Sequence, residues 1–381
     1  MSAVRLWDIF CTVVDNYGDI GVTWRLARQL VDEHDQQVRL WVDDLNSFAR
    51  ICRALDPTRP QQVCQGVDIR LWPLDFHADP QLADIVIEAF ACTLPSRQIE
   101  AMQQRQQPPL WINLEYLTAE AWIDDCHGLP SRQQGLNKFF FFPGFSERSG
   151  GLICERSLRL QRERWQAATS LRQQWLAELG LPPAAENSLF LSLFTYESTA
   201  LPALIQHWQQ AAQPIVCLIP QGRSLISLAD LIPNAAPGLH WQQGALTIHI
   251  LPMTDQPGYD QLLWSCDLNL VRGEDSFLRA QWAARPFIWH IYPQQEAAHL
   301  DKLDAFLQRY CATLSAPCRQ AITALSHAYD AGDGESAVSA WKEVMSCWPE
   351  WQKHAAEWPR QALAGGDLAS RLVIFCENRL K

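Results

Sequence analysis

One segment, VRGEDSFLRAQWAARPFIWHIYPQ (271–294), constrains the fold of this chain more than any other. The segment begins at the end of an apolar strand, which breaks at Arg272 and Gly273. A helical run, Phe277 to Ala284, follows the break. A proline follows the helical run, and Phe287 to Tyr292 are again apolar and strand-like. Strand, turn, helix and strand make a βαβ unit, and such units bind ligands at the carboxyl end of the first strand. The sequence therefore predicts an α/β fold with a binding edge at this turn.

The turn gathers a cation, two carboxylates and a hydroxyl within five residues. A helix that starts at Ser276 would direct free N–H groups and the positive end of its dipole at a phosphate. Arg272 could offset the charge of a diphosphate there, and Glu274 could accept hydrogen bonds from sugar hydroxyls. The alternative is an acidic N-cap turn of an ordinary α/β protein, in which Arg272 pairs with Glu274 or Asp275.

Length, charge and cysteine usage exclude several classes of protein. A chain of 381 residues is long enough for two domains, and a net charge of −11 argues against a nucleic-acid or anionic-membrane binder. The N-terminus does not have the pattern of a signal peptide, and no stretch approaches the roughly 18 apolar residues of a spanning helix. The 12 cysteines form no C-x-x-C pair and the histidines no zinc-ligand spacing. Buried reduced thiols, and hence a cytoplasmic protein, are the expectation.

Strands and helices alternate in two series, which predicts two Rossmann-like domains. The first domain is expected over residues 1–160 and the second over 187–365. A polar helical linker, 161–186, ends in the proline-rich stretch LPPAAENS that marks the boundary. Helices alone follow residue 294, and the last of them occupies 366–381.

A second group of polar residues directly follows the first apolar strand. Asp15, Asn16, Tyr17, Gly18 and Asp19 lack the glycine fingerprint of a dinucleotide-binding loop, although they occupy the same position. Two carboxylates in such a loop suit proton abstraction or the binding of a cationic acceptor. Mutual repulsion would raise the proton affinity of one of them, as a general base requires. The alternative is structural, with Asp19 as the N-cap of the next helix and Asp15 at the strand end.

Aromatic residues are predicted at the same edge of the second domain as the polar turn. Phe194 and Tyr196 end its first strand, and Tyr259 lies in a loop that leads into the helix before the central strand. Together they could sandwich a nucleobase. For any single aromatic residue in a chain with so many, burial in the core is the alternative.

With these residues in view, the chain resembles the elongation factor P-specific protein-arginine rhamnosyltransferases (the EarP family), which are inverting glycosyltransferases of the GT-B type. The resemblance covers nearly the whole chain, and Tyr259 stands where many relatives are expected to have phenylalanine. It depends on five stretches: FCTVVDNYGDIGVTWRLARQL (10–30), LWINLEYLTAE (110–120), FFPGFSERSGGLI (141–153), CDLNLVRGEDSFLRAQWAARPFIWHIYPQ (266–294) and HLDKL (299–303).

The resemblance implies transfer of L-rhamnose from dTDP-β-L-rhamnose to an arginine of elongation factor P, with inversion. It implies no cofactor, no metal, no nucleic acid and no membrane, and a final helix that braces the N-terminal domain. Pattern and resemblance together assign catalysis to Asp15, Asp19 and Glu274. They assign binding of the nucleotide sugar to Asn16, Tyr17, Gly18, Phe194, Tyr196, Gln256, Tyr259, Arg272, Glu274, Asp275 and Ser276.

Within that set, the resemblance implies that Phe194 and Tyr259 pack on thymine near Gln256. Glu274 would hold the pentose, while the diphosphate would meet three residues: Tyr196, Asp275 and Ser276. Asp19 is the favoured general base, because a guanidinium is protonated at working pH and must lose a proton to attack.

Two other functions remain compatible with the same architecture. An NAD-dependent oxidoreductase would share the fold, but the missing glycine fingerprint argues against it. A non-catalytic protein-binding scaffold would not need polar residues gathered at strand ends. Binding of NAD, or binding of elongation factor P without sugar transfer, would favour these alternatives.

Overall fold

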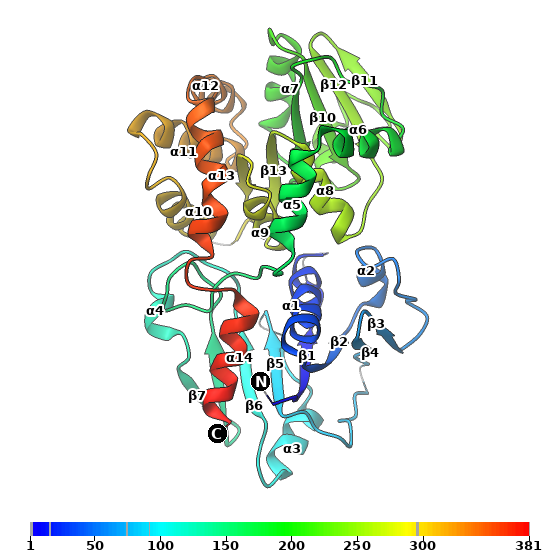
Figure 1. Cartoon of the computed structure of the whole chain (residues 1–381), viewed down its shortest axis with the longest axis vertical. Helices are drawn as coiled ribbons and strands as arrows, with labels where there is room; N and C mark the ends of the chain where they lie inside the picture. The colour runs from blue at the N-terminus through cyan, green and yellow to red at the C-terminus, as the bar shows by residue number, and fades with distance from the viewer. Residues whose placement is uncertain (1–2, 15–16, 74, 91, 295–296, 381) are drawn as a thin grey trace. The chain divides into compact units, whose positions relative to one another are not determined.

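The computed structural model describes residues 3–14, 17–73, 75–90, 92–294 and 297–380 (Figure 1). The chain divides into two compact units. The first consists of Met1–Arg156 and Ala362–Lys381, and the second of Ser157–Gln361. The helical stretch expected as a linker thus belongs to the second unit, and the last helix belongs to the first. Each unit is an α/β structure with its own sheet, as the alternating pattern predicts.

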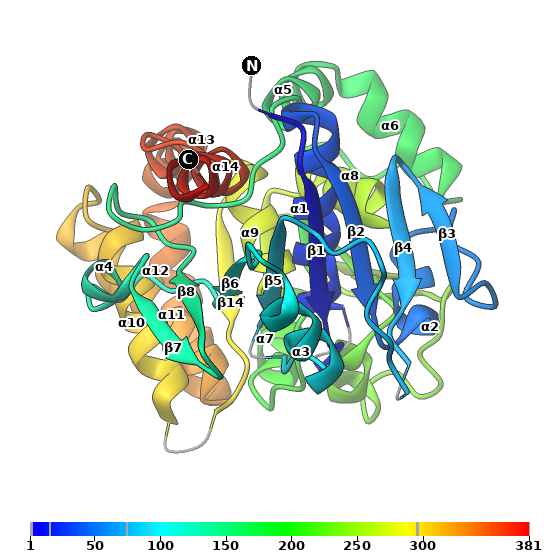
Figure 2. The ribbon, with the colours of Figure 1, turned by 90° about the horizontal axis from the view of Figure 1, so that it is seen from below.

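The sheet of the first unit has the strand order β3-β4-β2-β1-β5-β6-β8-β7, and several of these strands lie side by side in Figure 2. Its six inner strands are parallel to one another, and an antiparallel hairpin closes each edge. Every residue of β5 and β6 is buried, as is typical of a parallel sheet covered on both faces. The strands are β1 (Leu6–Cys11), β2 (Gln37–Val42), β3 (Gln61–Cys64), β4 (Val67–Leu71), β5 (Ile85–Ala89), β6 (Leu110–Leu114), β7 (Pro130–Gln133) and β8 (Leu136–Phe141).

In the described part of this unit, five helices accompany the sheet. The last one, α14, is tied to the first through a buried glutamine, since Gln29 Nε2 donates to Asp367 Oδ1 at 3.0 Å and to the carbonyl of Cys154 at 2.9 Å. Asp367 also caps α14 by accepting from the N–H of Ser370 at 3.0 Å. The helices are α1 (Gly18–His34), α2 (Leu45–Ala49), α3 (Ser96–Gln104), α4 (Ile123–Cys126) and α14 (Leu368–Arg379).

The sheet of the second unit has the strand order β11-β12-β10-β9-β13-β14. The strands are parallel except for β11, which pairs antiparallel with β12 at the edge. All residues of β9, β10, β13 and β14 are buried, so this sheet too forms the centre of its unit. The strands are β9 (Leu189–Leu193), β10 (Ile215–Pro220), β11 (His240–Gln243), β12 (Leu246–Leu251), β13 (Leu268–Arg272) and β14 (Phe287–His290).

The predicted βαβ segment occupies the β13–β14 side of this sheet. Its helix begins at Asp275, one residue before the expected start at Ser276. Its second strand ends at His290 rather than at Tyr292. The helices of the unit are α5 (Leu158–Ala167), α6 (Thr169–Glu178), α7 (Leu201–Gln209), α8 (Gln256–Ser265), α9 (Asp275–Trp282), α10 (Ala298–Tyr310), α11 (Ala316–Asp330), α12 (Gly334–Ser346) and α13 (Trp348–Ala362), with a 3₁₀ turn at Arg223–Leu228.

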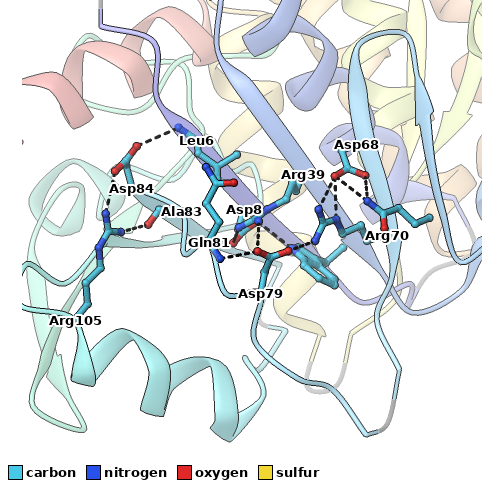
Figure 3. Close-up of polar contacts among 12 residues, drawn as sticks. Leu6, Asp8, Arg39, Asp68, Arg70, Asp79, Gln81, Ala83, Asp84 and Arg105 are labelled. Atoms are coloured by element: carbon cyan, nitrogen blue, oxygen red, sulfur yellow. Dashed lines mark hydrogen bonds and ion pairs between the residues drawn. The ribbon is translucent and has the colours of Figure 1, made fainter.

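A buried ion pair connects β1 to β2 in the first unit (Figure 3). Arg39 Nε and Nη2 donate to the two carboxylate oxygens of Asp8 at 2.6 and 2.7 Å, and Trp41 Nε1 adds a bond of 3.0 Å. Burial raises the pKa of the Asp8 carboxyl, and the Arg39 guanidinium opposes that rise. Arg39 Nη1 also meets Asp79 at 3.1 Å, which fixes the loop that leads into β5. Arg70 pairs in turn with Asp68 and with Asp79.

We expect Asp8→Asn to lower the free energy of unfolding by about 3–5 kcal/mol, because it leaves the buried Arg39 charge without its bidentate partner. Asp68→Asn removes a carboxylate that is a quarter exposed, so its cost should stay below about 1 kcal/mol. Urea-induced unfolding of the two variants measures the difference. Equal destabilisation by both would contradict the role assigned to the buried pair.

Candidate active site

The carboxyl ends of β9 and β13 bring together three residues that the sequence placed at strand ends. The guanidinium carbon of Arg272 lies 4.8 Å from the centre of the Phe194 ring and 4.9 Å from that of Tyr196. All three side chains are buried, and cation–π attraction strengthens when the cation is desolvated. Arg272 Nη1 is buried and has no hydrogen-bond partner among the described residues. An anionic ligand would supply that missing partner.

Buried hydroxyl groups hold the loop after β9 in place. Ser224 Oγ accepts from the N–H of Thr195 at 2.7 Å and donates to the carbonyl of Thr195 at 3.0 Å. The Thr195 hydroxyl lies 2.9 Å from the hydroxyl of Tyr329. The N–H of Phe194 donates to the carbonyl of Leu270 on β13 at 2.9 Å. These bonds help to position both aromatic rings of the loop against Arg272.

The polar turn after β13 has the conformation that a helix-start binding site requires. Gly273 has a φ of 57°, a left-handed conformation that glycine adopts at little cost. Its carbonyl accepts from Trp289 Nε1 at 2.9 Å, which ties the turn to β14. The α-helix α9 then begins at Asp275, and Glu274 precedes it without a side-chain cap. Glu274, Asp275 and Ser276 are half-buried at the start of this helix.

The beginning of α8 adds the remaining predicted residues of this edge. Tyr259 contacts Phe194 edge-to-face, with ring centres 5.5 Å apart and planes at 60°. Because these two rings touch each other, a base would pack on the pair rather than between its members. Burial raises the pKa of the Tyr259 phenol, whose oxygen has no well-formed hydrogen bond, and the nearby Ser276 hydroxyl opposes that rise. Gln256, the first residue of α8, is buried close by in the chain.

The structure adds residues to this edge that the sequence reasoning did not assign. Arg223, after β10, lies 5.3 Å from the centre of the Tyr196 ring and pairs with Glu197 at 2.7 Å. His290, the last residue of β14, contacts Tyr196 edge-to-face, with ring centres 5.4 Å apart. His290 could have been identified from the sequence as a polar residue at the end of a predicted strand. Arg223 follows its strand by three residues, and nothing in the local pattern distinguishes it.

His290 makes the stability of this edge dependent on pH. Burial lowers the pKa of its imidazole to about 4, so the folded state favours the neutral ring. The unfolded chain takes up a proton near the ordinary value of about 6.5. Stability is therefore fully present above pH 6.5 and is lost as pH falls from 6.5 towards 4.

We expect His290→Asn to weaken this dependence, because the variant lacks the group that takes up a proton on unfolding. Between pH 7 and pH 5, the free energy of unfolding should change less in the variant than in the unchanged chain. The slope of this free energy against pH should be smaller by the equivalent of up to about one proton. Denaturant titrations of both proteins at the two pH values measure the slope. Identical slopes would contradict a buried neutral His290.

In the first unit, Asp19 lies in the first turn of α1 and is 4% exposed. Its Oδ2 accepts from the N–H of Val14 at 3.2 Å, across the loop that follows β1. The residue at the N-cap position is Tyr17, so the alternative in which Asp19 caps the helix is wrong. Among the described residues, and apart from its chain neighbours and its own helix backbone, no heavy atom lies within 4 Å of the place a Cβ would take on Gly18.

The other two residues predicted in this loop, Asp15 and Asn16, lie outside the described residues. Among the residues that are described, no group of three or more His, Cys, Asp or Glu side chains is arranged to hold a metal ion. No described helix is long and apolar enough to cross a membrane. The predicted site residues thus fall into two sets, one at α1 in the first unit and one at the sheet edge of the second.

Comparisons with known proteins show the family to which the chain is related. Residues 7–377 match the family described as Elongation-Factor P (EF-P) rhamnosyltransferase EarP. The protein-arginine rhamnosyltransferase of Pseudomonas aeruginosa is 50% identical over 372 residues, which cover 97% of this chain and 98% of that protein. Its counterpart from Shewanella oneidensis is 49% identical over 385 residues, which cover 98% of both chains.

A solved structure from work on EarP-mediated arginine glycosylation of translation elongation factor EF-P is also similar. It is 36% identical, has a TM-score of 0.71, and the match covers 98% of this chain and 99% of that one. The predicted GT-B-like α/β fold and the predicted glycosyltransferase activity are thereby confirmed. This chain belongs to the EarP family of protein-arginine rhamnosyltransferases.

Proposed function

We propose that this chain transfers L-rhamnose from dTDP-β-L-rhamnose to one arginine side chain of translation elongation factor P, with inversion at the sugar carbon. The observation that carries the proposal is the near full-length similarity to protein-arginine rhamnosyltransferases at about 50% identity. The description of the family and the related solved structure both name EF-P, which supports the choice of acceptor. An acceptor of this kind also supports a cytoplasmic location.

The second unit would bind the nucleotide sugar. Phe194 and Tyr259 would pack on thymine near Gln256, and Glu274 would accept hydrogen bonds from the pentose. The Phe194–Tyr259 contact offers one apolar surface for a planar base. Glu274 is half-buried and directly precedes α9 at this edge.

The diphosphate would lie at Arg272 and the start of α9. Arg272 can place its unpartnered Nη1 on a phosphate oxygen, and the first N–H groups of α9, at Asp275 and Ser276, point out of the helix. Tyr196 would border the same position. Negative charge grows on the diphosphate as its bond to the sugar breaks, and preorganised donors stabilise that charge most in the transition state. With these donors in place, we propose a reaction that needs neither metal nor cofactor.

The first unit would supply the base. A guanidino nitrogen attacks the anomeric carbon from the face opposite the diphosphate, the new C–N bond forms as the C–O bond breaks, and Asp19 accepts the proton that the nitrogen loses. One displacement inverts the configuration without a covalent enzyme intermediate. Asp15 and Glu274 remain predicted partners in orienting the reacting groups.

Intact-mass spectrometry of EF-P tests the proposal. After incubation with this chain and dTDP-L-rhamnose in excess chelator, we expect a gain of one deoxyhexose on a single arginine, and NMR of the product should show an α-linkage. Donor binding without any gain would overturn the acceptor, a β-linkage would overturn inversion, and activity lost only with chelator would overturn metal independence. Failure to bind the donor would contradict the proposal as a whole.

A further inference from the structure

Three strands of the first unit end at the same level and place a second set of groups near the Asp19 loop. Cys11 of β1 is in register with Ala89 of β5, which is in register with Leu114 of β6. The next residues along these strands are Thr12, Phe90 and Glu115. Neighbouring strands are about 4.8 Å apart, so the ends of β1 and β6 are separated by about 10 Å. Thr12, at the start of the segment that leads to Asp19, therefore lies beside Phe90 and near Glu115.

Phe90 has a backbone conformation that is uncommon for its residue type. Its φ is 55°, in the left-handed region where bulky residues are outliers. Its N–H donates to the carbonyl of Leu114 at 2.8 Å, and its ring stacks on that of Tyr116 with centres 4.9 Å apart and planes at 29°. Strained residues held by their surroundings gather at functional sites. Here the strained backbone holds the buried ring of Phe90 against one face of the half-buried Tyr116 ring.

Glu115 lies between these aromatic rings and β8. The amide of Asn113, which is buried, donates to Glu115 Oε1, and the N–H of Glu115 donates to the carbonyl of Phe141 at 3.0 Å. The carboxylate is thereby oriented, while the residue as a whole is only half-buried. A planar aromatic pair next to an oriented carboxylate is a combination that suits a guanidinium, which stacks on rings and binds carboxylates through its N–H groups.

We propose that Glu115 and the Phe90–Tyr116 pair form the subsite that receives the guanidinium of the acceptor arginine. Glu115 accepts N–H bonds from the guanidinium, and the ring of Tyr116 stacks on its plane. This inference rests on the proposed function, because it concerns the acceptor of the same reaction. Glu115 acts as a positioning residue: it holds the cation and orients one nitrogen, while Asp19 remains the proton acceptor.

The test is steady-state transfer to EF-P by Glu115→Gln and Tyr116→Leu, with Tyr116→Phe and Glu120→Gln as matched controls. Glu120 lies five residues further along the segment, and its carboxylate accepts from the neighbouring Thr118 hydroxyl at 2.8 Å. We expect Glu115→Gln to lower kcat/KM for EF-P by about 10- to 100-fold, and Tyr116→Leu by about 2- to 10-fold. Tyr116→Phe and Glu120→Gln should retain the activity of the unchanged chain.

Two further readouts separate a guanidinium subsite from a structural role. The KM for the donor should be unchanged in Glu115→Gln. The inhibition constant of free methylguanidine should rise in this variant together with the KM for EF-P. Transfer by Glu115→Gln and Tyr116→Leu at the rate of the unchanged chain would overturn the subsite and leave the proposed function intact. An equal loss of donor and acceptor binding would also overturn it, as a structural effect. Absence of transfer by the unchanged chain would instead overturn the proposed function, and the subsite with it.

Discussion

Asp19→Ala is expected to slow rhamnosyl transfer by about 10²- to 10⁴-fold while the affinity for the nucleotide sugar stays unchanged. This range is what a positioned general base contributes to a reaction that must remove a proton. Asp19 is buried in the first turn of α1, and its Oδ2 accepts from the N–H of Val14 at 3.2 Å. The donor-binding groups at the sheet edge, among them Phe194, Tyr259 and Arg272, lie in the other unit, so the substitution leaves them in place. Single-turnover transfer kinetics and calorimetric titration with dTDP-L-rhamnose measure the two quantities.

Two variants serve as controls for the Asp19 experiment. Asp19→Asn keeps the shape of the side chain and its acceptor oxygen but cannot take up a proton, so it should be nearly as slow as Asp19→Ala. Asp32→Asn removes an exposed carboxylate from the same helix and should transfer at the normal rate. Full activity of Asp19→Asn would rule out the general-base assignment, and loss of donor binding would place Asp19 in the donor site instead.

Arg272→Met is expected to weaken binding of dTDP by about 10- to 100-fold, which is the range for hydrogen bonds to charged groups. Methionine retains an apolar stem against Phe194 and Tyr196, so the packing of the rings should survive while the cation is lost. Affinity for thymidine, which has no phosphate, should change little. Titration calorimetry with both ligands therefore reports whether Arg272 acts on the diphosphate or only supports the aromatic pair.

Arg272→Lys refines the same comparison. A lysine retains the charge but cannot bridge two oxygens or stack as a plane, so its affinity for dTDP should lie between those of the unchanged chain and Arg272→Met. If dTDP and thymidine lose affinity equally in Arg272→Met, the residue has a structural role. If neither ligand loses affinity, the diphosphate binds elsewhere.

Much of the second unit's edge could be predicted from the sequence because each part depends on local pattern. The break after β13 needs a glycine with positive φ, and Gly273 has one. Phe194, Tyr196 and Arg272 follow apolar runs, and the carboxyl ends of parallel strands share one edge. Their contact depends on the strand order, which the local pattern does not contain. Only the sheet, in which β9 pairs with β13, places Arg272 against both rings.

The groups that the sequence did not reveal have roles set by distant neighbours. His290 is an ordinary residue at the end of an apolar strand until packing buries it against Tyr196 and lowers its pKa. Glu115 and Phe90 are 25 residues apart in the chain, and they become neighbours because β5 pairs with β6. The sequence by itself determined the alternation of strands and helices and the polar residues at strand ends, since these follow from local periodicity and turn chemistry. The tertiary structure alone decided which strand ends meet, because strand order depends on long-range packing of the whole core.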